Sequence, residues 1–263
     1  MLAFSKANAK TRRLRQIPAL SKYLQNNRRV YSLDLLSGWS CPGALHCLSK
    51  VIADDNNKRH IKDGRFCQFR CFSASQEVVF PHTYALRKRN LTALRDTRGV
   101  SQCYKLLSRG LPPNCGILRL HVAGDFFKLS YLQAVLRLAN ERPDILFYAY
   151  TKALPFFQHI HIYNPGLGIV NKTGNFLVTA SYGGKYDQLI SQLELRSAKV
   201  VFTEAEAKKL PIDHNDNHAA TIGGNFALLL HGQQPAKSPA SRALQTLKNN
   251  GISGYQRKLK KGD

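Results

Sequence analysis

The feature that most constrains the fold is an alternation of strand-like and helical segments in the second half of the chain. Residues 117–124, 145–153, 175–183 and 198–205 read as strands, and the segments between them have the length and apolar spacing of helices. Strands joined by such helices require right-handed crossovers, so they align in parallel. The alternation therefore predicts an α/β fold built on a parallel sheet.

Small or polar residues stand where each of these predicted strands ends. They are Gly124 and Asp125, Thr151 and Lys152, Ser181 and Tyr182, and Thr203 and Glu204. In a (β/α) barrel the carboxyl ends of the strands meet around one mouth, where ligands bind. The pattern favours an incomplete (β/α) barrel-like parallel sheet, to which four cysteines earlier in the chain add an N-terminal metal-binding region. An open doubly wound sheet is the alternative.

Four cysteines precede this alternation in the spacing C-x5-C-x19-C-x3-C. They are Cys41, Cys47, Cys67 and Cys71. Two close pairs joined by a longer loop can supply the four thiolates of one metal site. Structural zinc usually has about two to four residues between paired ligands, so the longer first interval favours a [4Fe–4S] cluster over zinc. Unligated buried thiols are the third possibility, and this is the preferred interpretation of the isolated Cys103 and Cys115.

The spacing also bears on whether the cluster would have an open iron. Radical S-adenosylmethionine enzymes leave one iron open by using three cysteines spaced C-x3-C-x2-C. Cys67 and Cys71 supply the first interval, but Ala74 stands at the third position. With four cysteines available, the sequence predicts a closed cluster with a structural or electron-transfer role.

Three segments carry a family resemblance: CPGALHC at 41–47, HVAGDFF at 121–127 and FYAYTKA at 147–153. Together they resemble the phage gene product 88 family, over about residues 32–203. The resemblance implies a barrel-like fold, a cysteine-bound iron–sulfur cluster and an origin in bacteriophages or mobile elements. Many members carry a late cysteine-rich segment, but residues 211–232 contain no cysteine, so only one cluster is expected here.

The strand ends also supply candidates for catalysis. His121, Asp125 and Lys152 could surround a phosphorylated or nucleotide substrate if they share the barrel mouth. The structural alternatives are a core histidine for His121 and a helix-capping carboxylate for Asp125. His214 and His218 could bind a metal together with Asp213 or Asp216, or their polar loop could simply turn.

Charge points to a partner. Lys and Arg total 39 against 16 Asp and Glu, a net charge of +23, which favours nucleic acid. Residues 1–30 read as a basic helix or arm, and the alternative is a terminal helix packed on the domain with a solvated cationic face. Residues 31–235 read as one α/β domain that includes the cysteine region 38–75, and 236–263 as a basic tail. Neither a membrane span nor a signal peptide is recognisable, so a cytoplasmic location is expected, in the host if the protein is phage-encoded.

Three hypotheses follow from the sequence. The first is a phage or mobile-element iron–sulfur protein associated with nucleic acid. The second is a barrel enzyme that acts on a phosphorylated or nucleotide substrate. The third is a zinc-stabilised nucleic-acid-binding protein.

Overall fold

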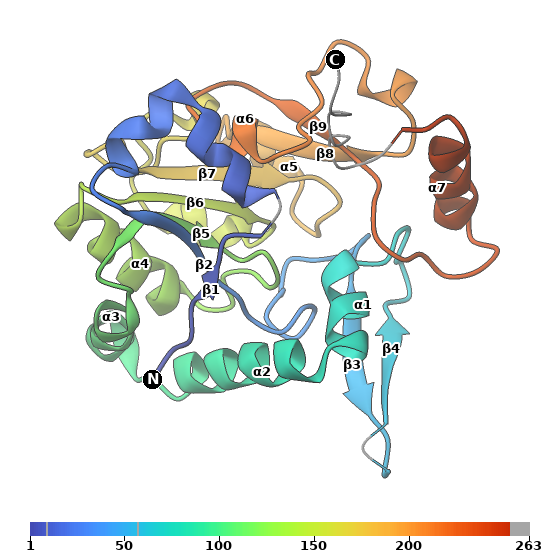
Figure 1. The fold of residues 1–263 in the computed structure, drawn as a ribbon, viewed down its shortest axis with the longest axis horizontal. Helices are drawn as coiled ribbons and strands as arrows, with labels where there is room; N and C mark the ends of the chain where they lie inside the picture. The colour runs from blue at the N-terminus through green and yellow to red at the C-terminus, as the bar shows by residue number, and fades with distance from the viewer. Residues whose placement is uncertain (9, 57, 253–263) are drawn as a thin grey trace.

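The computed structural model describes residues 1–8, 10–56 and 58–252, and a seven-stranded sheet forms its centre (Figure 1). The strand order is β1-β2-β5-β6-β7-β8-β9; β1 is antiparallel to β2, and every later pair of neighbours is parallel. The strands are β1 (Ser5–Lys6), β2 (Arg29–Leu33), β5 (Cys115–Leu120), β6 (Leu146–Thr151), β7 (Phe176–Ser181), β8 (Ser197–Val201) and β9 (Phe226–Leu229).

Both faces of this sheet are covered. Alternate side chains of a strand point to opposite faces; in β5, Leu118 and Leu120 enter one core and Ile117 enters the other. The first core packs against α2 (Pro81–Arg95), α3 (Gly99–Gly110) and α4 (Leu129–Glu141). The second packs against the 3₁₀ helices η1 (Thr11–Gln16) and η2 (Pro18–Tyr23) and against α6 (Asn217–Ala220).

The remaining helical elements are short or peripheral. They are α1 (Phe72–Val79), η3 (Leu154–His159), η4 (Pro165–Leu167), α5 (Gln188–Gln192), η5 (Ala205–Ala207) and α7 (Pro239–Asn249). Within the described residues, no helix has both the length and the apolar character needed to cross a membrane.

The α/β class, the parallel sheet and the four predicted strands are confirmed, since β5 to β8 lie where the sequence places them. The barrel-like part of the prediction finds no support in the described strands, which form an open sheet with β1 and β9 at its edges. Leu14 and Leu20 of the N-terminal segment are buried against the second face. That face is therefore filled by the chain itself.

Both terminal segments that the sequence sets apart from the domain contain regular structure. Residues 1–30 do not form one continuous helix: β1 joins the sheet, and Pro18 begins a second 3₁₀ turn where a continuous helix would have run on. The segment packs on the domain through Leu14 and Leu20, as the packed alternative predicts. At the other end, α7 lies within the predicted tail of residues 236–263. Residues 253–263, the last part of that predicted tail, lie outside the described residues.

A separate two-stranded hairpin of β3 (Ser49–Ala53) and β4 (Arg59–Asp63) projects beside α1 (Figure 1). Its strands pair antiparallel, with Ser49 opposite Asp63. An antiparallel hairpin returns the chain to its starting point. It therefore accounts for the long interval between the two cysteine pairs, because the second pair begins where the hairpin closes.

Candidate functional site

The first cysteine pair lies in the loop between β2 and β3, which folds over the carboxyl ends of β6 and β7. The His46 backbone N–H in this loop donates to the Gly183 carbonyl oxygen at 2.9 Å. Gly43 lies so close to the end of β6 that a Cβ atom there would meet the Lys152 carbonyl oxygen at 1.9 Å. Only glycine permits this approach, so the loop is fixed against the strand ends.

The second pair lies between β4 and α1, and its loop is hydrogen-bonded to the loop of the first pair and to the base of the hairpin. The Gln68 N–H donates to the His46 carbonyl oxygen at 2.8 Å. The Ser49 hydroxyl accepts the Cys71 N–H at 3.4 Å and lies 3.8 Å from Cys67 Sγ. All four cysteines of the predicted site are thereby brought to one end of the sheet.

A glycine also supports the first ligand of the predicted site. The Gly38 N–H donates to Cys41 Sγ at 3.3 Å. Gly38 has a φ of +70°, and a Cβ atom there would meet the Ser49 carbonyl oxygen at 2.4 Å. An N–H donor directed at sulfur stabilises a thiolate and tunes a bound cluster.

The thiols influence one another electrostatically. Burial raises the pKa of Cys41 well above its ordinary value, and the nearby Asp125 and Cys71 raise it further. Burial, followed by the effect of Cys47, raises the pKa of Cys71 to about 11, and burial also raises the pKa of Cys67. Without metal these three thiols are protonated at neutral pH, so metal binding would release protons.

The cysteine arrangement bears on the kind of metal group it could hold. In the part of the chain that the structure describes, no three or more His, Cys, Asp or Glu side chains are arranged to hold a metal ion. A tetrahedral zinc draws its thiolates to about 2.3 Å from one centre, whereas a [4Fe–4S] cube separates its ligating sulfurs more widely. Over the described residues the structure therefore supports neither zinc nor a cluster directly, and both remain proposals.

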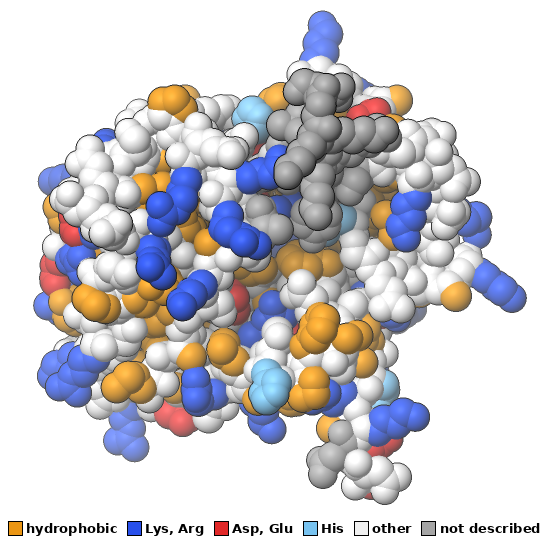
Figure 2. Space-filling view, viewed as in Figure 1, with side chains coloured by type: hydrophobic (Ala, Val, Ile, Leu, Met, Phe, Trp, Pro, Cys, Tyr) orange, Lys and Arg blue, Asp and Glu red, His pale blue; other side chains and the backbone are white. Residues whose placement is uncertain are grey.

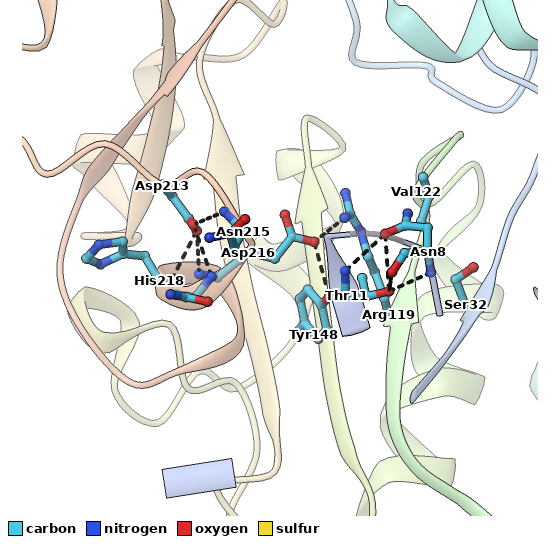
Figure 3. A network of polar contacts seen from close by, with 12 residues as sticks. Asn8, Thr11, Ser32, Arg119, Val122, Tyr148, Asp213, Asn215, Asp216 and His218 are labelled. Carbon is cyan, nitrogen blue, oxygen red and sulfur yellow. Dashed lines mark hydrogen bonds and ion pairs between the residues drawn. The ribbon is translucent and has the colours of Figure 1, made fainter. Parts of the chain in front are cut away.

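The loop with the two candidate histidines is organised by a carboxylate. Asp213 accepts the backbone N–H groups of Asn217 and His218, each at 3.0 Å (Figure 3). The His218 ring stacks on Phe226, with ring centroids 5.6 Å apart. These contacts start α6, which gives His218 a structural role. His214 belongs to no group of potential metal ligands among the described residues.

A cavity of about 360 Å³ lies where the cysteine loops meet the sheet. Three of the cysteines line it, namely Cys41, Cys47 and Cys71, while Cys67 lies outside it. Five residues of the predicted strand ends also line it: Gly124, Asp125, Thr151, Lys152 and Ser181. Tyr182, Thr203 and Glu204, which the sequence grouped with them, are not part of this wall. The cysteines and the strand ends of β5, β6 and β7 thus share one site.

The Asp125 carboxylate links the carboxyl ends of β5 and β6. Its carboxylate accepts the Thr151 hydroxyl, the Lys152 N–H and the Phe126 N–H, each at 2.7 Å. Burial raises its pKa to about 6, although the three donors act in the opposite direction. With its oxygens engaged in this way, Asp125 positions the β6 end and is poorly placed to act as a general base.

His121 is a core residue that reaches the cavity. Its Nε2 lies 2.9 Å from the Tyr131 hydroxyl, and its ring packs edge-on against Phe126 with centroids 4.7 Å apart. Burial, reinforced by the Arg119 charge, lowers the pKa of His121 to about 3. The imidazole is therefore neutral at physiological pH, as suits the core-histidine alternative.

Lys152 differs from these two residues because its charged end remains available. Its side chain is buried, and Nζ lies 2.5 Å from Ser181 Oγ. Gly183 and Gly184, which follow Ser181, use their N–H groups to bind Asp187 at 2.8 Å each. Those amides are therefore not free for a phosphate, and Lys152 with Ser181 is the remaining polar pair of this wall.

Sequence reasoning missed a second polar cluster at the cavity. Arg119 of β5 pairs with Asp216, which also accepts the Tyr148 hydroxyl at 3.2 Å (Figure 3). Burial opposes the charge of Arg119, but Asp216 and two tyrosines outweigh it and raise the pKa of the guanidinium. Arg119 itself is the sequence signal that could have revealed this cluster, because it is a charged residue within an otherwise apolar strand. Lys10 of the N-terminal segment lines the same cavity.

Comparison with known proteins agrees with the motif resemblance. The family described as Gene product 88 matches residues 2–247, which is nearly the whole chain. The chain belongs to the Gene product 88 family. The matched residues include both cysteine loops and all the strand ends that line the cavity. The candidate site therefore lies inside the region that this chain shares with the family.

A curated protein of similar name resembles part of this chain. The Gene 88 protein of Mycobacterium phage L5 is 27% identical over 106 residues, which cover 36% of this chain and 44% of that protein. The match therefore spans less than half the length of this relative. No solved structure matches the chain.

Proposed function

We propose that this Gene product 88 protein is a phage-type iron–sulfur protein that binds one [4Fe–4S] cluster. The ligands are Cys41, Cys47, Cys67 and Cys71. The observation that carries the proposal is the hairpin between the two pairs, because it returns the second pair to the first at the strand ends. No comparable structural reason brings Cys103 or Cys115 to this place, and both are core residues.

The donor set suits the group. Four thiols are the usual ligands of such a cluster, and N–H donation to a ligating sulfur, as at Cys41, is a common way of tuning its potential. A bound cluster supplies one-electron chemistry and covalent cross-links between loops. The chain contributes burial, hydrogen bonding and the separation of the two pairs, which supports a structural or electron-transfer role.

The test is metal content. Protein purified without oxygen should contain about four iron and four sulfide per chain and absorb broadly near 400 nm, roughly where thiolate-to-iron charge transfer falls. Cys41→Ser and Cys71→Ser should lose iron, whereas Cys103→Ser should keep it. Wild-type protein with one zinc and no iron would instead support the zinc-stabilised alternative and exclude the cluster.

Association with nucleic acid is the second part of the proposal. It is supported by the net charge of +23 and by the exposed cations of the N-terminal segment. These include Arg12, Arg15, Lys22 and Arg29. On the face drawn in Figure 2, Lys and Arg side chains gather around this segment and acidic side chains are few. Such a surface binds phosphates without reading sequence.

The reducing cytoplasm of a host cell is the compartment that fits this function. All six cysteines are free thiols in the described structure. Free thiols and iron–sulfur clusters both persist where disulfides are kept reduced.

A further inference from the structure

The cavity extends well beyond the cysteines. Its far wall is built from the strands, with Val200, Leu228 and Leu230 giving an apolar surface and Tyr150 an aromatic one. Its volume of about 360 Å³ lies within the range of small-molecule sites, about 300–1,000 Å³. A cluster bound at the cysteine side would therefore border a space that is lined by other residues.

The charges of this cavity are unevenly matched. Arg119 pairs with Asp216, and Arg70 pairs with Asp63. Lys10, the third cation of the lining, interacts electrostatically with Asp216 and Asp213. Lys152 has no carboxylate within ion-pair distance among the described residues. Asp125 interacts electrostatically with Lys152 but directs its oxygens to the Thr151 hydroxyl and to two backbone N–H groups, so the Ser181 hydroxyl is the hydrogen-bond partner of Nζ.

A buried ammonium paired only with a neutral hydroxyl is unfavourable. Lys152 is 7% exposed, so water solvates its charge poorly. Buried charges are normally compensated by an opposite charge or by several strong hydrogen bonds. An anionic group that enters the cavity would add a direct counter-charge at Nζ, and the side chain of Ser181 offers a second hydrogen bond to the same group.

We propose that this cavity binds a small organic anion, whose phosphate or carboxylate group pairs with Lys152 and Ser181 while its apolar body rests against the strand wall. This inference rests on the proposed function only in placing a cluster beside the bound molecule. Anion binding itself can be measured whether or not iron is present. The protein would then be a substrate-binding iron–sulfur protein, with the anion held between strand ends and cysteine loops.

Three probes with a common ring test this inference. Phenyl phosphate and benzoate each join an apolar body to an anion and separate the phosphate from the carboxylate source, while benzamide is the uncharged match. Calorimetric titration of the anaerobically purified full chain should show one-to-one binding of at least one anion and at least about tenfold weaker binding of benzamide. Equal binding of benzamide, or no binding of any probe, overturns the proposal.

Variants identify the cation. Lys152→Gln should weaken the bound anion at least about tenfold, and Lys199→Gln, an exposed lysine of β8, should not change it. If Lys152→Gln does not fold by circular dichroism, Ser181→Ala provides the test, with about two- to tenfold weaker binding expected from the loss of one hydrogen bond. Unchanged binding in a folded Lys152→Gln protein, or failing that in Ser181→Ala, overturns the assignment.

Iron analysis of the same samples keeps the two proposals separate. Wild-type protein that binds an anion but contains no iron would refute the cluster and leave the anion site standing. Protein with a full complement of iron and no anion binding would do the reverse.

Discussion

Glu77 accepts two hydrogen bonds from Ser37, one from its backbone N–H at 3.0 Å and one from its hydroxyl at 2.8 Å. Ser37 precedes the first cysteine pair, and Glu77 lies in α1, which begins directly after the second. Arg87 of α2 completes the contact through Nη1 at 3.0 Å. The two segments that carry the cysteines are thus joined by a buried carboxylate outside the cavity.

Glu77→Gln should destabilise the protein and loosen the cysteine region together. Burial raises the pKa of Glu77 even though Arg87 opposes this, so the pair is costly to desolvate. Removing one partner leaves the buried Arg87 charge without compensation, which costs about 3–5 kcal/mol. Urea unfolding should show this loss, and iron should leave the variant faster in the presence of a chelator.

An exposed ion pair provides the control for Glu77. Glu141 pairs with Arg137 one helical turn away, and both side chains are largely solvated. Because water screens such pairs, Glu141→Gln should leave the urea midpoint and the iron release rate unchanged. Equal behaviour of the two variants would show that the Glu77 contact does not hold the cysteine loops.

Asp125→Ala should lower the stability of the fold. Replacing a purely catalytic carboxylate would leave the stability unchanged. The substitution leaves the Thr151 hydroxyl and the Lys152 and Phe126 N–H groups without their acceptor. Each buried group left unpaired costs about 1–3 kcal/mol. The midpoint temperature of thermal unfolding should therefore fall in Asp125→Ala. In the control Asp96→Ala, at an exposed helix end, it should not change. An unshifted Asp125→Ala protein would restore the catalytic interpretation.

Acid should destabilise the protein through His121. Burial lowers the pKa of this imidazole from 6.5 to about 3, so between these values the unfolded chain binds a proton that the folded chain does not. The stabilisation is complete above pH 6.5 and is lost as the pH falls toward 3, by up to about 1.4 kcal/mol per pH unit. Asp125 acts oppositely: burial raises its pKa from 3.8 to about 6, so its contribution is present below 3.8 and lost as the pH rises through 6.

The two contributions can be separated by substitution. His121 has a left-handed φ of +67°, which asparagine tolerates better than most residues. His121→Asn should therefore remove up to about 1.4 kcal/mol per pH unit of acid destabilisation between about pH 6.5 and 4, so that the variant gains stability relative to wild type as the pH falls. His82→Asn, on an exposed helix position, should keep the wild-type slope. A wild-type slope in His121→Asn would contradict the assignment.

Binding to nucleic acid should weaken steeply as salt rises. Each phosphate neutralised by a cation contributes a slope of about −0.9 to the dependence of log affinity on log salt for duplex DNA. Replacing Arg12 and Lys22 of the N-terminal segment by Gln should reduce the magnitude of this slope by up to about the contribution of two phosphate contacts. The exposed Lys105 and Arg109 of α3 are the matched pair, and their loss should change it less. Affinity insensitive to salt would exclude the phosphate-contact account.

Local patterns in the sequence were sufficient for the strands and their polar ends. The alternation predicts β5 to β8. These features depend on neighbours within a few residues, through side-chain periodicity and backbone restriction. The closure into a barrel could not be judged in this way, because it depends on what covers the second face.

The four cysteines were identified by spacing alone, and the Gene product 88 resemblance by short motifs. Only the tertiary structure decided that three of them share a cavity with Asp125 and Lys152. That decision rests on contacts between segments distant in the chain: Gly43 against the end of β6, and Glu77 against Ser37. Such contacts depend on steric fit and buried hydrogen bonds in three dimensions, which leave no periodic trace in the sequence.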